Sequence, residues 1–299
     1  MKMRPSRVLR RLRAGQLATS AKINSADPRV VEIAASSGFD CVWLCNEHVP
    51  TDWLTMENMV RAAKLHDCDA MVRVSRGSYS DYVRPLEMDA AGIMVPHLMS
   101  AQQARDVVRM TKFHPVGRRP VDGGNLDGFF CKIDPVAYAE QANRERFVVL
   151  QIEDPEPLDE LDEIAAVPGY EMLLFGPGDF SHGIGKLGQW ECPEVLAARA
   201  AVVDAARRHG KFAGTVCAPA QTREMWEMGY QFLNVCADVV GLVNYFDDVV
   251  ETLAEDGVLR TDRETVEHER LGELLPCRQG CPCHRGRGPV RSPDRGRPC

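Results

Sequence analysis

Two acidic residues stand where long apolar segments of the sequence end. Glu153 closes the segment FVVLQIE, and Asp179 lies two positions after the segment EMLLFGP. If the two segments are neighbouring parallel strands about 4.8 Å apart, both carboxylates lie over one point at the carboxyl ends of the strands. Two hard oxygen donors with room for water suit Mg²⁺ or Mn²⁺. The alternative is that both residues cap the helices that follow, although Asp154 and Ser181 are available for that role.

Eight short apolar segments supply the strands that could position these residues. Segments with apolar residues at three- and four-residue spacing separate them, as is typical of helices. The strands are predicted at 16–23, 40–47, 70–75, 92–96, 147–153, 171–177, 211–217 and 231–238. Near-continuous apolar runs are expected where both faces of a parallel sheet are covered. Eight strand–helix units predict an α/β fold of the (β/α)8 TIM-barrel type, with its function at the carboxyl ends of the strands.

An open doubly wound sheet is the alternative architecture. It requires a Gly-rich turn after the first strand, where KINSADPR stands instead, so the barrel is favoured. The barrel domain is predicted to span 1–256, with a possible extra helix at 257–276. Residues 277–299 are rich in Gly, Pro and Arg and are predicted to be a disordered basic tail. Its CRQGCPCH segment lacks a second CxxC, so a zinc site is not favoured.

The charge of the chain is unevenly distributed. The net charge is −7, and residues 277–299 carry six Arg and one Asp, a balance of +5, which leaves −12 for the remainder. An acidic body argues against a nucleic-acid partner. The sequence contains no run of 18 apolar residues, so no membrane span is predicted. The first residues also lack the apolar stretch of a secretory signal. The predicted location is therefore the cytoplasm, with reduced thiols.

The stretch LQIED…GYEMLLFGPGDFSHGIG resembles the signature of the HpcH/HpaI aldolase/citrate lyase family, class II aldolases of the 2-dehydro-3-deoxyglucarate aldolase type. The resemblance extends over roughly residues 7–250 and includes LRAGQLATSAKI, FDCVWLCNEH, LEMDAAGIMVP and HPVGRRPV in order. It implies a barrel that binds a divalent cation through Glu153 and Asp179 and forms a homo-oligomer, a trimer or hexamer. The implied reaction joins or splits pyruvate (or a related 2-oxo acid) and an aldehyde through a metal-bound enolate.

The resemblance also assigns roles to Arg73 and His48. Arg73, two residues before the third predicted strand ends, matches the family's Arg that stabilises the enolate oxygen. The alternative for Arg73 is a salt bridge on the barrel rim. His48 follows the second strand, where the family carries a catalytic His that moves protons to and from the aldol oxygen. Its neighbour Glu47 either contacts a metal-bound water or only orients the loop.

Three positions depart from the family pattern. The family's His is usually paired with an Asp, and an ungapped alignment of LEMDAAGIMVP puts Glu87 at that position. Asp89 stands where Gly is usual, and Cys45 where Asp is common. Glu87 can still orient His48, but one extra methylene changes the geometry. We therefore expect substrate preference or proton transfer to differ from that of other members.

The Gly-Pro-Gly turn of FGPGDFS is predicted to bind substrate as well as metal. The amide N–H groups of Gly178 and Asp179 can form a carboxylate site, and the family uses this turn for the carboxylate of the 2-oxo acid. Gln151 points the same way as Glu153 along the strand and either contacts the 2-oxo acid or fills the barrel interior. Weaker candidates are Arg119 in a long covering loop, His182 as a ligand and Asp238 as a helix cap.

Two other functions stay open beside the aldolase. One is an oxaloacetate decarboxylase, or an enolate-using synthase that forms carbon–carbon bonds, on the same barrel. The other is a catalytically inactive interaction protein, which the changes at Cys45 and Glu87 suggest and the intact Glu153, Asp179 and Arg73 oppose. No Lys is expected at a strand end on the active face, which disfavours a Schiff-base mechanism.

Overall fold

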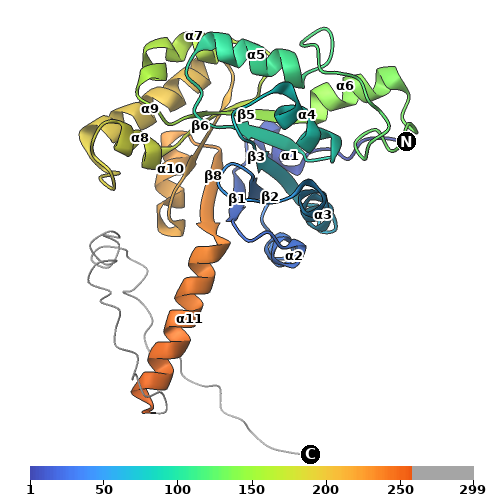
Figure 1. The fold of residues 1–299 in the computed structure, drawn as a ribbon. Helices are drawn as coiled ribbons and strands as arrows, with labels where there is room; N and C mark the ends of the chain where they lie inside the picture. Colours follow the sequence, from blue (N-terminus) through green and yellow to red (C-terminus); the bar gives the residue numbers. More distant parts are fainter. Residues whose placement is uncertain (258–299) are drawn as a thin grey trace, which may run out of the picture. The chain divides into compact units, whose positions relative to one another are not determined.

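The computed structural model describes residues 1–257 of the 299-residue chain and contains a closed barrel of eight parallel strands (Figure 1). The strands are β1 Ala18–Ile23, β2 Cys41–Cys45, β3 Asp69–Arg73, β4 Gly92–Val95, β5 Phe147–Ile152, β6 Met172–Phe175, β7 Phe212–Val216 and β8 Phe232–Ala237. The barrel closes because β8 pairs with β1. The predicted (β/α)8 barrel is confirmed, and each strand ends within two residues of its predicted bounds.

Helices alternate with the strands, and most of them lie around the outside of the barrel (Figure 1). They are α1 Arg7–Arg13, α2 Pro28–Ser36, α3 Trp53–Lys64, α4 Tyr79–Glu87, α5 Ala101–Thr111, α6 Pro135–Glu145, α7 Leu161–Ala166, α8 Pro177–Gly183, α9 Pro193–Arg208, α10 Thr222–Met228 and α11 Asp238–Glu255, with 3-10 turns at Glu156–Glu160 and Pro219–Gln221. Local sequence explains how α2 and α6 begin. Asp27 and Asp134 cap them with side-chain hydrogen bonds, and each helix starts with a Pro.

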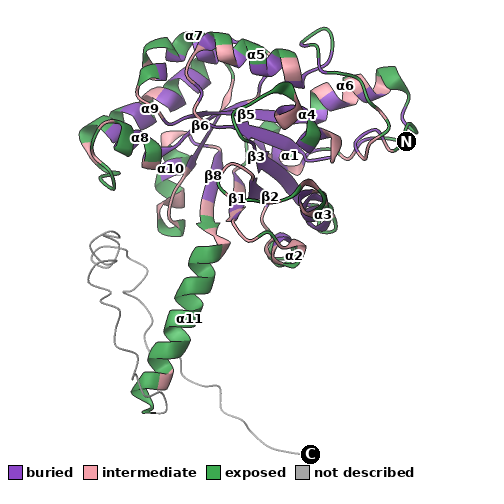
Figure 2. Ribbon diagram, viewed as in Figure 1, coloured by how far each residue is buried: buried purple, intermediate pink, exposed green. Residues whose placement is uncertain are grey.

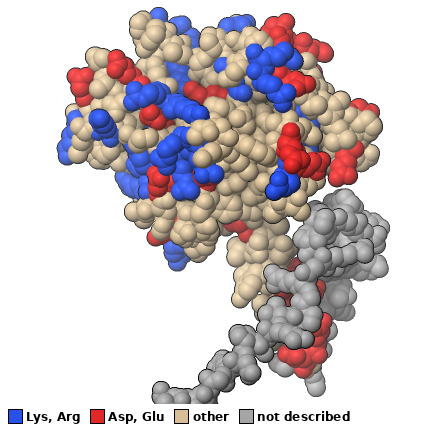
Figure 3. All heavy atoms as spheres, turned by 180° about the vertical axis from the view of Figure 1, so that it is seen from behind, with Lys and Arg blue, Asp and Glu red and all other residues tan. Residues whose placement is uncertain are grey.

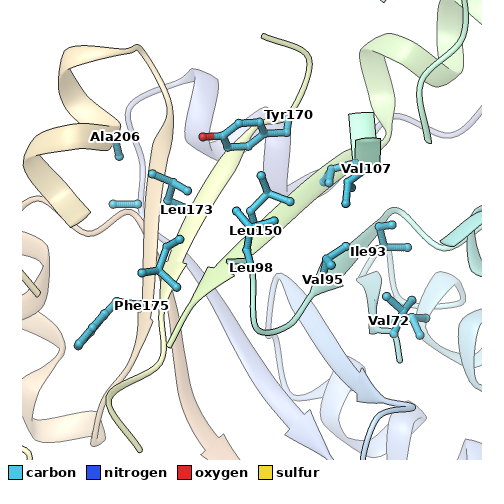
Figure 4. Close-up of a cluster of buried hydrophobic side chains, with 14 of the residues drawn as sticks. Val72, Ile93, Val95, Leu98, Val107, Leu150, Tyr170, Leu173, Phe175 and Ala206 are labelled. Carbon is cyan, nitrogen blue, oxygen red and sulfur yellow. The ribbon is translucent and has the colours of Figure 1, made fainter. Parts of the chain in front are cut away.

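Two apolar cores hold the barrel together. The larger lies between the strands and the surrounding helices, and Figure 4 shows part of it around Leu150 and Leu173. The smaller fills the barrel interior and contains side chains from α1. Its members include Val8, Leu9, Leu12, Trp43, Met71, Phe147, Met172 and Phe232. Strands β2 to β6 are buried along their whole length (Figure 2), which explains their near-continuous apolar sequences.

Buried charges at the end where the strands begin are paired. Asp69, the first residue of β3, accepts hydrogen bonds from the Ser6 hydroxyl (2.6 Å), the Val8 N–H (2.9 Å) and the Arg4 guanidinium. Asp89 follows α4 with φ +68°, a conformation that favours glycine, and its carboxylate pairs with Lys64 and Arg146. Asp89, which stands where the resemblance predicts Gly, therefore belongs to the ion pairs at the end of the barrel where the strands begin. On the face shown in Figure 3, basic and acidic side chains are interspersed.

The described chain divides into two units at Asp247 and Asp248, inside α11. The predicted domain boundary at 256 lies just past the end of this helix. No residue of α11 is buried (Figure 2). The predicted helix at 257–276, apart from Gly257, and the predicted tail at 277–299 lie outside the described residues. None of the described helices combines the length and apolar character needed to cross a bilayer.

Candidate active site

The structure brings the two predicted carboxylates together at the end of the barrel where the strands finish. Glu153 directly follows β5 and is 1% exposed, while Asp179 lies exposed in the first turn of α8, which follows β6. Ligand atoms of Glu153, Asp179 and His97 all lie within 4.8 Å of one another. Because β5 and β6 are adjacent in the barrel, the two acidic residues reach the same point, as their spacing in the sequence predicts.

Neighbouring groups hold the Glu153 carboxylate in place. The backbone N–H of His97 donates to Glu153 Oε1 (2.9 Å), and the side-chain amide of Gln151 donates to Glu153 Oε2. A Cβ at Gly176 would lie 2.7 Å from Oε2, so only glycine fits beside this carboxylate. The pKa of Glu153 is raised to about 7, mainly by burial; His97 and Arg73 oppose the change, and the charge of Asp179 adds to it. A cation between the two carboxylates would remove this penalty.

His97 belongs to the site although the sequence analysis did not identify it. It follows β4 by two residues, and its Nδ1 lies 2.9 Å from Asp154 Oδ2. Its Nε2 lies 3.7 Å from Glu153 Oε1 and 3.8 Å from Glu47 Oε1. Burial lowers the pKa of His97, but the hydrogen bond to Asp154 and the nearby carboxylates outweigh burial and raise it. The rule applied to Glu153, a polar residue just after a strand, would have found His97 too.

Arg73, the last residue of β3, is buried beside the carboxylates. Its Nε lies 2.9 Å from Glu47 Oε2, an ion pair whose angles are not those of a hydrogen bond. An Nη donates to Cys45 Sγ (3.2 Å), and the guanidinium lies over the Trp43 ring, 5.0 Å from its centroid. Burial raises the pKa of the Cys45 thiol, but Arg73 outweighs burial, so that pKa is lowered. The Cys45 thiol, where the resemblance predicts an Asp, is therefore an acceptor for Arg73.

The structure does not bring His48 and Glu87 together within one chain. His48 is exposed after β2, with its Nε2 3.4 Å from Glu47 Oε2. Glu87 is the last residue of α4, on the side of the barrel where β4 begins, and burial raises its pKa. The described residues show no hydrogen bond between them. Their catalytic roles stay predictions, and Glu47 is the carboxylate beside His48 in this chain.

Lys22 corrects the expectation that no lysine would lie near the site. It is the penultimate residue of β1 and pairs in register with Trp43, whose ring centroid lies 5.6 Å from Nζ. Burial lowers the pKa of Lys22, as does Arg73, while the nearby groups of Cys45, Glu47 and Asp179 oppose this. Lys22 lies inside the predicted first strand, one residue before its end.

The predicted substrate-binding residues also lie here. Gln151 is 3% exposed, and its Oε1 has no hydrogen-bond partner among the described residues. Gly178 is the second residue of α8, where amide N–H groups have no acceptor within the helix, and a Cβ there would meet open space. These groups could accept a small polar ligand without rearrangement of the backbone.

Three weaker candidates do not join the site as ligands. Arg119 is buried, with an Nη 2.8 Å from Asp127 Oδ2. Its loop starts at the end of α5, on the side of the barrel where the strands begin, so it does not cover the site of its own barrel. His182 is exposed in the last turn of α8, outside the ligand cluster. Asp238, the first residue of α11, accepts hydrogen bonds from the N–H groups of Asn24 (2.8 Å) and Ser25 (2.9 Å) as well as Val239 (2.8 Å).

The sequence around this site matches a known family. The HpcH/HpaI aldolase/citrate lyase family matches residues 23–244, which include every residue of the site except Lys22. The chain belongs to the HpcH/HpaI aldolase/citrate lyase family. The resemblance stated from the sequence is therefore confirmed, and the protein is an enzyme of the aldolase and lyase type.

Relatives within the family are similar over most of their length. The hydroxypyruvate/pyruvate aldolase of Pseudomonas aeruginosa is 32% identical over 235 residues, which cover 78% of this chain and 87% of the relative. The crystal structure of an HpcH/HpaI aldolase from Desulfitobacterium hafniense has a TM-score of 0.79 and 30% identity, covering 83% of this chain and 96% of that one. The crystal structure of the citrate synthase SbnG has a TM-score of 0.76 and 25% identity, covering 83% of this chain and 97% of that one.

The residues present fit a divalent cation. Two carboxylates and an imidazole converge within 4.8 Å, the buried carboxylate has a raised pKa, and a buried amide oxygen of Gln151 lacks a partner. A buried carboxylate with a second carboxylate beside it is costly unless a cation joins them. The site therefore has suitable donor atoms for a metal ion, and a bound cation would offset the repulsion between its carboxylates.

Proposed function

We propose that this protein is a divalent-metal-dependent aldolase that cleaves or forms 4-hydroxy-2-oxo acids from an aldehyde and pyruvate or a related 2-oxo acid. The convergence of Glu153 and Asp179 beside the buried guanidinium of Arg73 carries the proposal. The similarity to a hydroxypyruvate/pyruvate aldolase supports pyruvate or a close analogue as the 2-oxo acid.

Glu153 and Asp179 would hold Mg²⁺ or Mn²⁺, with other divalent cations as possible substitutes. The bound ion would act as a Lewis acid on the carbonyl of the 2-oxo acid. Gln151 and Gly176 keep Glu153 in position, the first by a hydrogen bond and the second by leaving space for the carboxylate.

Arg73 supplies positive charge where the enolate oxygen develops. Arg73 is 4% exposed, and its guanidinium is held by Glu47 on one side, by Cys45 on another and by the ring of Trp43. A guanidinium with a restricted orientation loses little entropy when it donates to a ligand. The Gly178 and Asp179 N–H groups would bind the carboxylate of the 2-oxo acid, and Gln151 would contact the same molecule.

His48 would move the proton of the hydroxyl group on the aldehyde side. It lies exposed at the edge of the barrel, where an incoming aldehyde would approach. Glu87 lies on the opposite end of its own barrel, so an interaction between Glu87 and His48 requires a second copy of the chain. Mixing inactive His48→Ala and Glu87→Ala proteins would then restore part of the activity, whereas a role within one chain predicts no recovery.

We also propose a homo-oligomer, a trimer or a hexamer. The last helix of the described residues, α11, carries many apolar side chains, yet none of its residues is buried, and Val240, Val243 and Phe246 are more than half exposed. Exposed apolar surface of this kind is typical of protein interfaces. Light scattering after gel filtration should give three or six times the 33.3 kDa subunit mass. A single-subunit mass would contradict this proposal.

The decisive assay combines purified protein, Mn²⁺ and pyruvate with hydroxypyruvate, glyceraldehyde or succinic semialdehyde. Mass spectrometry should detect a 4-hydroxy-2-oxo acid, and Glu153→Gln should abolish it. Glu156→Gln is the matched control, because Glu156 is exposed three residues further on and does not belong to the ligand cluster.

A decarboxylase or synthase that uses oxaloacetate is the second candidate. The similarity to the citrate synthase SbnG, at 25% identity over 97% of that chain, favours it. The same carboxylate pair and Arg73 would serve an enolate produced by loss of CO₂. Incubation with oxaloacetate alone separates the two functions: release of CO₂ without an aldol product from any aldehyde would overturn the aldolase.

A further inference from the structure

We propose that His97 is a third protein ligand of the metal, through Nε2, and that this nitrogen donor makes the site prefer Mn²⁺ and Co²⁺ over Mg²⁺. The inference deepens the proposed function and rests on its metal site. Nε2 lies 3.7 Å from Glu153 Oε1, and the two groups share a cluster of ligand atoms with Asp179. Donor atoms about 2.1 Å from one ion lie roughly 3 to 4 Å from each other, so these separations are close to those of a shared site.

Asp154 prepares His97 for this role. Its carboxylate lies 2.9 Å from Nδ1 and so holds the proton on that nitrogen. In the neutral imidazole the lone pair is then on Nε2, which faces Glu153 and Glu47 rather than a hydrogen-bond donor. A metal-binding His whose other nitrogen donates to a carboxylate is a recurrent arrangement, because the carboxylate fixes the tautomer and strengthens the ligand.

The backbone of His97 is held in an unusual conformation that aims the ring at the site. Its φ is +48°, in the left-handed region that non-glycine residues rarely adopt. The N–H donates to Glu153 Oε1 (2.9 Å), and the carbonyl oxygen accepts from Arg76 Nη1 (2.9 Å). Strained backbone that persists because contacts on both sides maintain it is often found at functional sites. The same carboxylate thus anchors the main chain of His97 and lies opposite its ring.

A second observation indicates that the cluster takes a ligand. The side chain of Gln151 is 97% buried, since 3% of the residue is exposed, and its Oε1 has no partner in the described chain although it lies beside Glu153. A water bound to a metal could satisfy such an oxygen.

The nitrogen donor has a consequence for the choice of metal. Mg²⁺ prefers oxygen ligands in a regular octahedron and keeps several waters, whereas imidazole suits later transition metals. Along the usual affinity order, a site with one imidazole binds Co²⁺ more tightly than Mn²⁺ and both more tightly than Mg²⁺. Two carboxylates alone would discriminate much less.

The test measures binding of the metal alone by the full chain after treatment with a chelator. Titration calorimetry with Mg²⁺, Mn²⁺ and Co²⁺ is carried out on the wild type, His97→Gln and Asp154→Asn. We expect His97→Gln to weaken Co²⁺ binding about tenfold or more while Mg²⁺ binding changes less than about threefold. Asp154→Asn should reduce Co²⁺ binding in the same direction by a smaller factor.

A control and a spectroscopic measurement complete the test. His209→Gln is the matched control, because His209 also pairs with a carboxylate, Asp162 at 3.0 Å, but lies outside the cluster. Spin-echo spectra of bound Mn²⁺ should show coupling to an imidazole nitrogen in the wild type and in His209→Gln, and none in His97→Gln.

Two different failures can be distinguished. If His97→Gln keeps the nitrogen coupling and the ratio of Co²⁺ to Mg²⁺ affinity, His97 is only the ion-pair partner of Asp154 and the inference is overturned. If Glu153→Gln binds all three metals as tightly as the wild type, the metal site itself is absent, and the proposed function fails with it.

Discussion

The two ends of the barrel contain equally buried carboxylates in opposite electrostatic surroundings. Where the strands begin, Asp69 is fully buried and receives hydrogen bonds from Arg4, the Ser6 hydroxyl and the Val8 N–H. Where the strands finish, Glu153 is 1% exposed, has another carboxylate beside it, and has a pKa raised to about 7. The first arrangement stabilises the fold, and the second brings like charges together.

This difference separates structural from functional charge. Buried charges that stabilise a protein have their hydrogen bonds satisfied, and removing one partner is costly. Groups with raised pKa values in a cleft often belong to functional sites. Function in barrels of this kind lies at the carboxyl ends of the strands, which agrees with the contrast between Asp69 and Glu153. The predictions below test that contrast, beginning with the largest effect.

Neutralising the pair at the active end should abolish activity without unfolding the protein. We expect Glu153→Gln and Asp179→Asn each to lower kcat/KM by about a thousandfold or more, since a Lewis acid contributes several kcal/mol. The melting temperature of the metal-free protein should stay the same or rise, because a like-charge repulsion is removed. Steady-state kinetics and calorimetry measure both. A large loss of stability would show that these charges are structural.

Changing Arg73→Lys should lower kcat by about a hundredfold, because an ammonium cannot keep both the contact with Glu47 and a donor for the enolate oxygen. The KM for the 2-oxo acid should change less than kcat. Arg61→Lys is the control, since Arg61 is an exposed residue of α3 that pairs with Glu57. An equal fall for both variants would contradict a specific role for Arg73.

At the other end, Asp69→Asn should destabilise the protein and spare its chemistry. Loss of charged hydrogen bonds to Arg4 and to Ser6 should lower the free energy of unfolding by about 2 kcal/mol. Urea unfolding gives this difference, and kcat of the folded protein should stay within about twofold of the wild type. A catalytic loss at full stability would break the comparison between the two ends.

Metal removal should make stability depend on pH through Glu153. Its pKa rises from 4.5 to about 7 in the folded chain, so the folded state binds this proton more tightly than the unfolded state does. The contribution is fully present below pH 4.5 and is lost as the pH rises through about 7, a change of roughly 1–3 kcal/mol.

Unfolding of chelator-treated protein at pH 5 and pH 8, compared with Glu153→Gln, isolates this contribution. The wild type should lose more stability than the variant as the pH rises, and saturating Mn²⁺ should remove the difference because metal binding requires the deprotonated carboxylate. Equal pH dependence in the two metal-free proteins would show that Glu153 titrates normally.

The smallest effect is expected where the chain departs from its family. Cys45→Asp keeps an acceptor for Arg73, and Glu87→Asp shortens a side chain that lies away from His48 of the same chain. The double variant should stay within about tenfold of the wild-type kcat while its preference among aldehydes changes. If neither the wild type nor the double variant turns over any tested substrate, the result would support the alternative of a catalytically inactive interaction protein.

The fold and several residues of the site could be predicted from the sequence. Buried strands in a covered parallel sheet must be apolar, so Glu153 at the end of such a strand and Asp179 just after the next were recognisable. Arg73 was recognisable by the same logic together with the family resemblance. The positions of Glu87 and Arg119 were misjudged, because Glu87 was placed by the family resemblance and Arg119 by the length of its loop. Both lie between the last turn of a helix and the next strand, which in a (β/α)8 barrel is the end where the strands begin.

The sequence by itself determined the eight strand–helix units, the family and the acidic pair, since these depend on local apolar patterns and on spacing between adjacent strands. The tertiary structure alone decided that His97 turns its Nε2 toward Glu153, that Lys22 lies beside Trp43, and that Cys45 accepts a hydrogen bond from Arg73. These contacts join residues from different strands. Their distances are set by the closure of the barrel and by backbone conformation, which no short stretch of sequence contains.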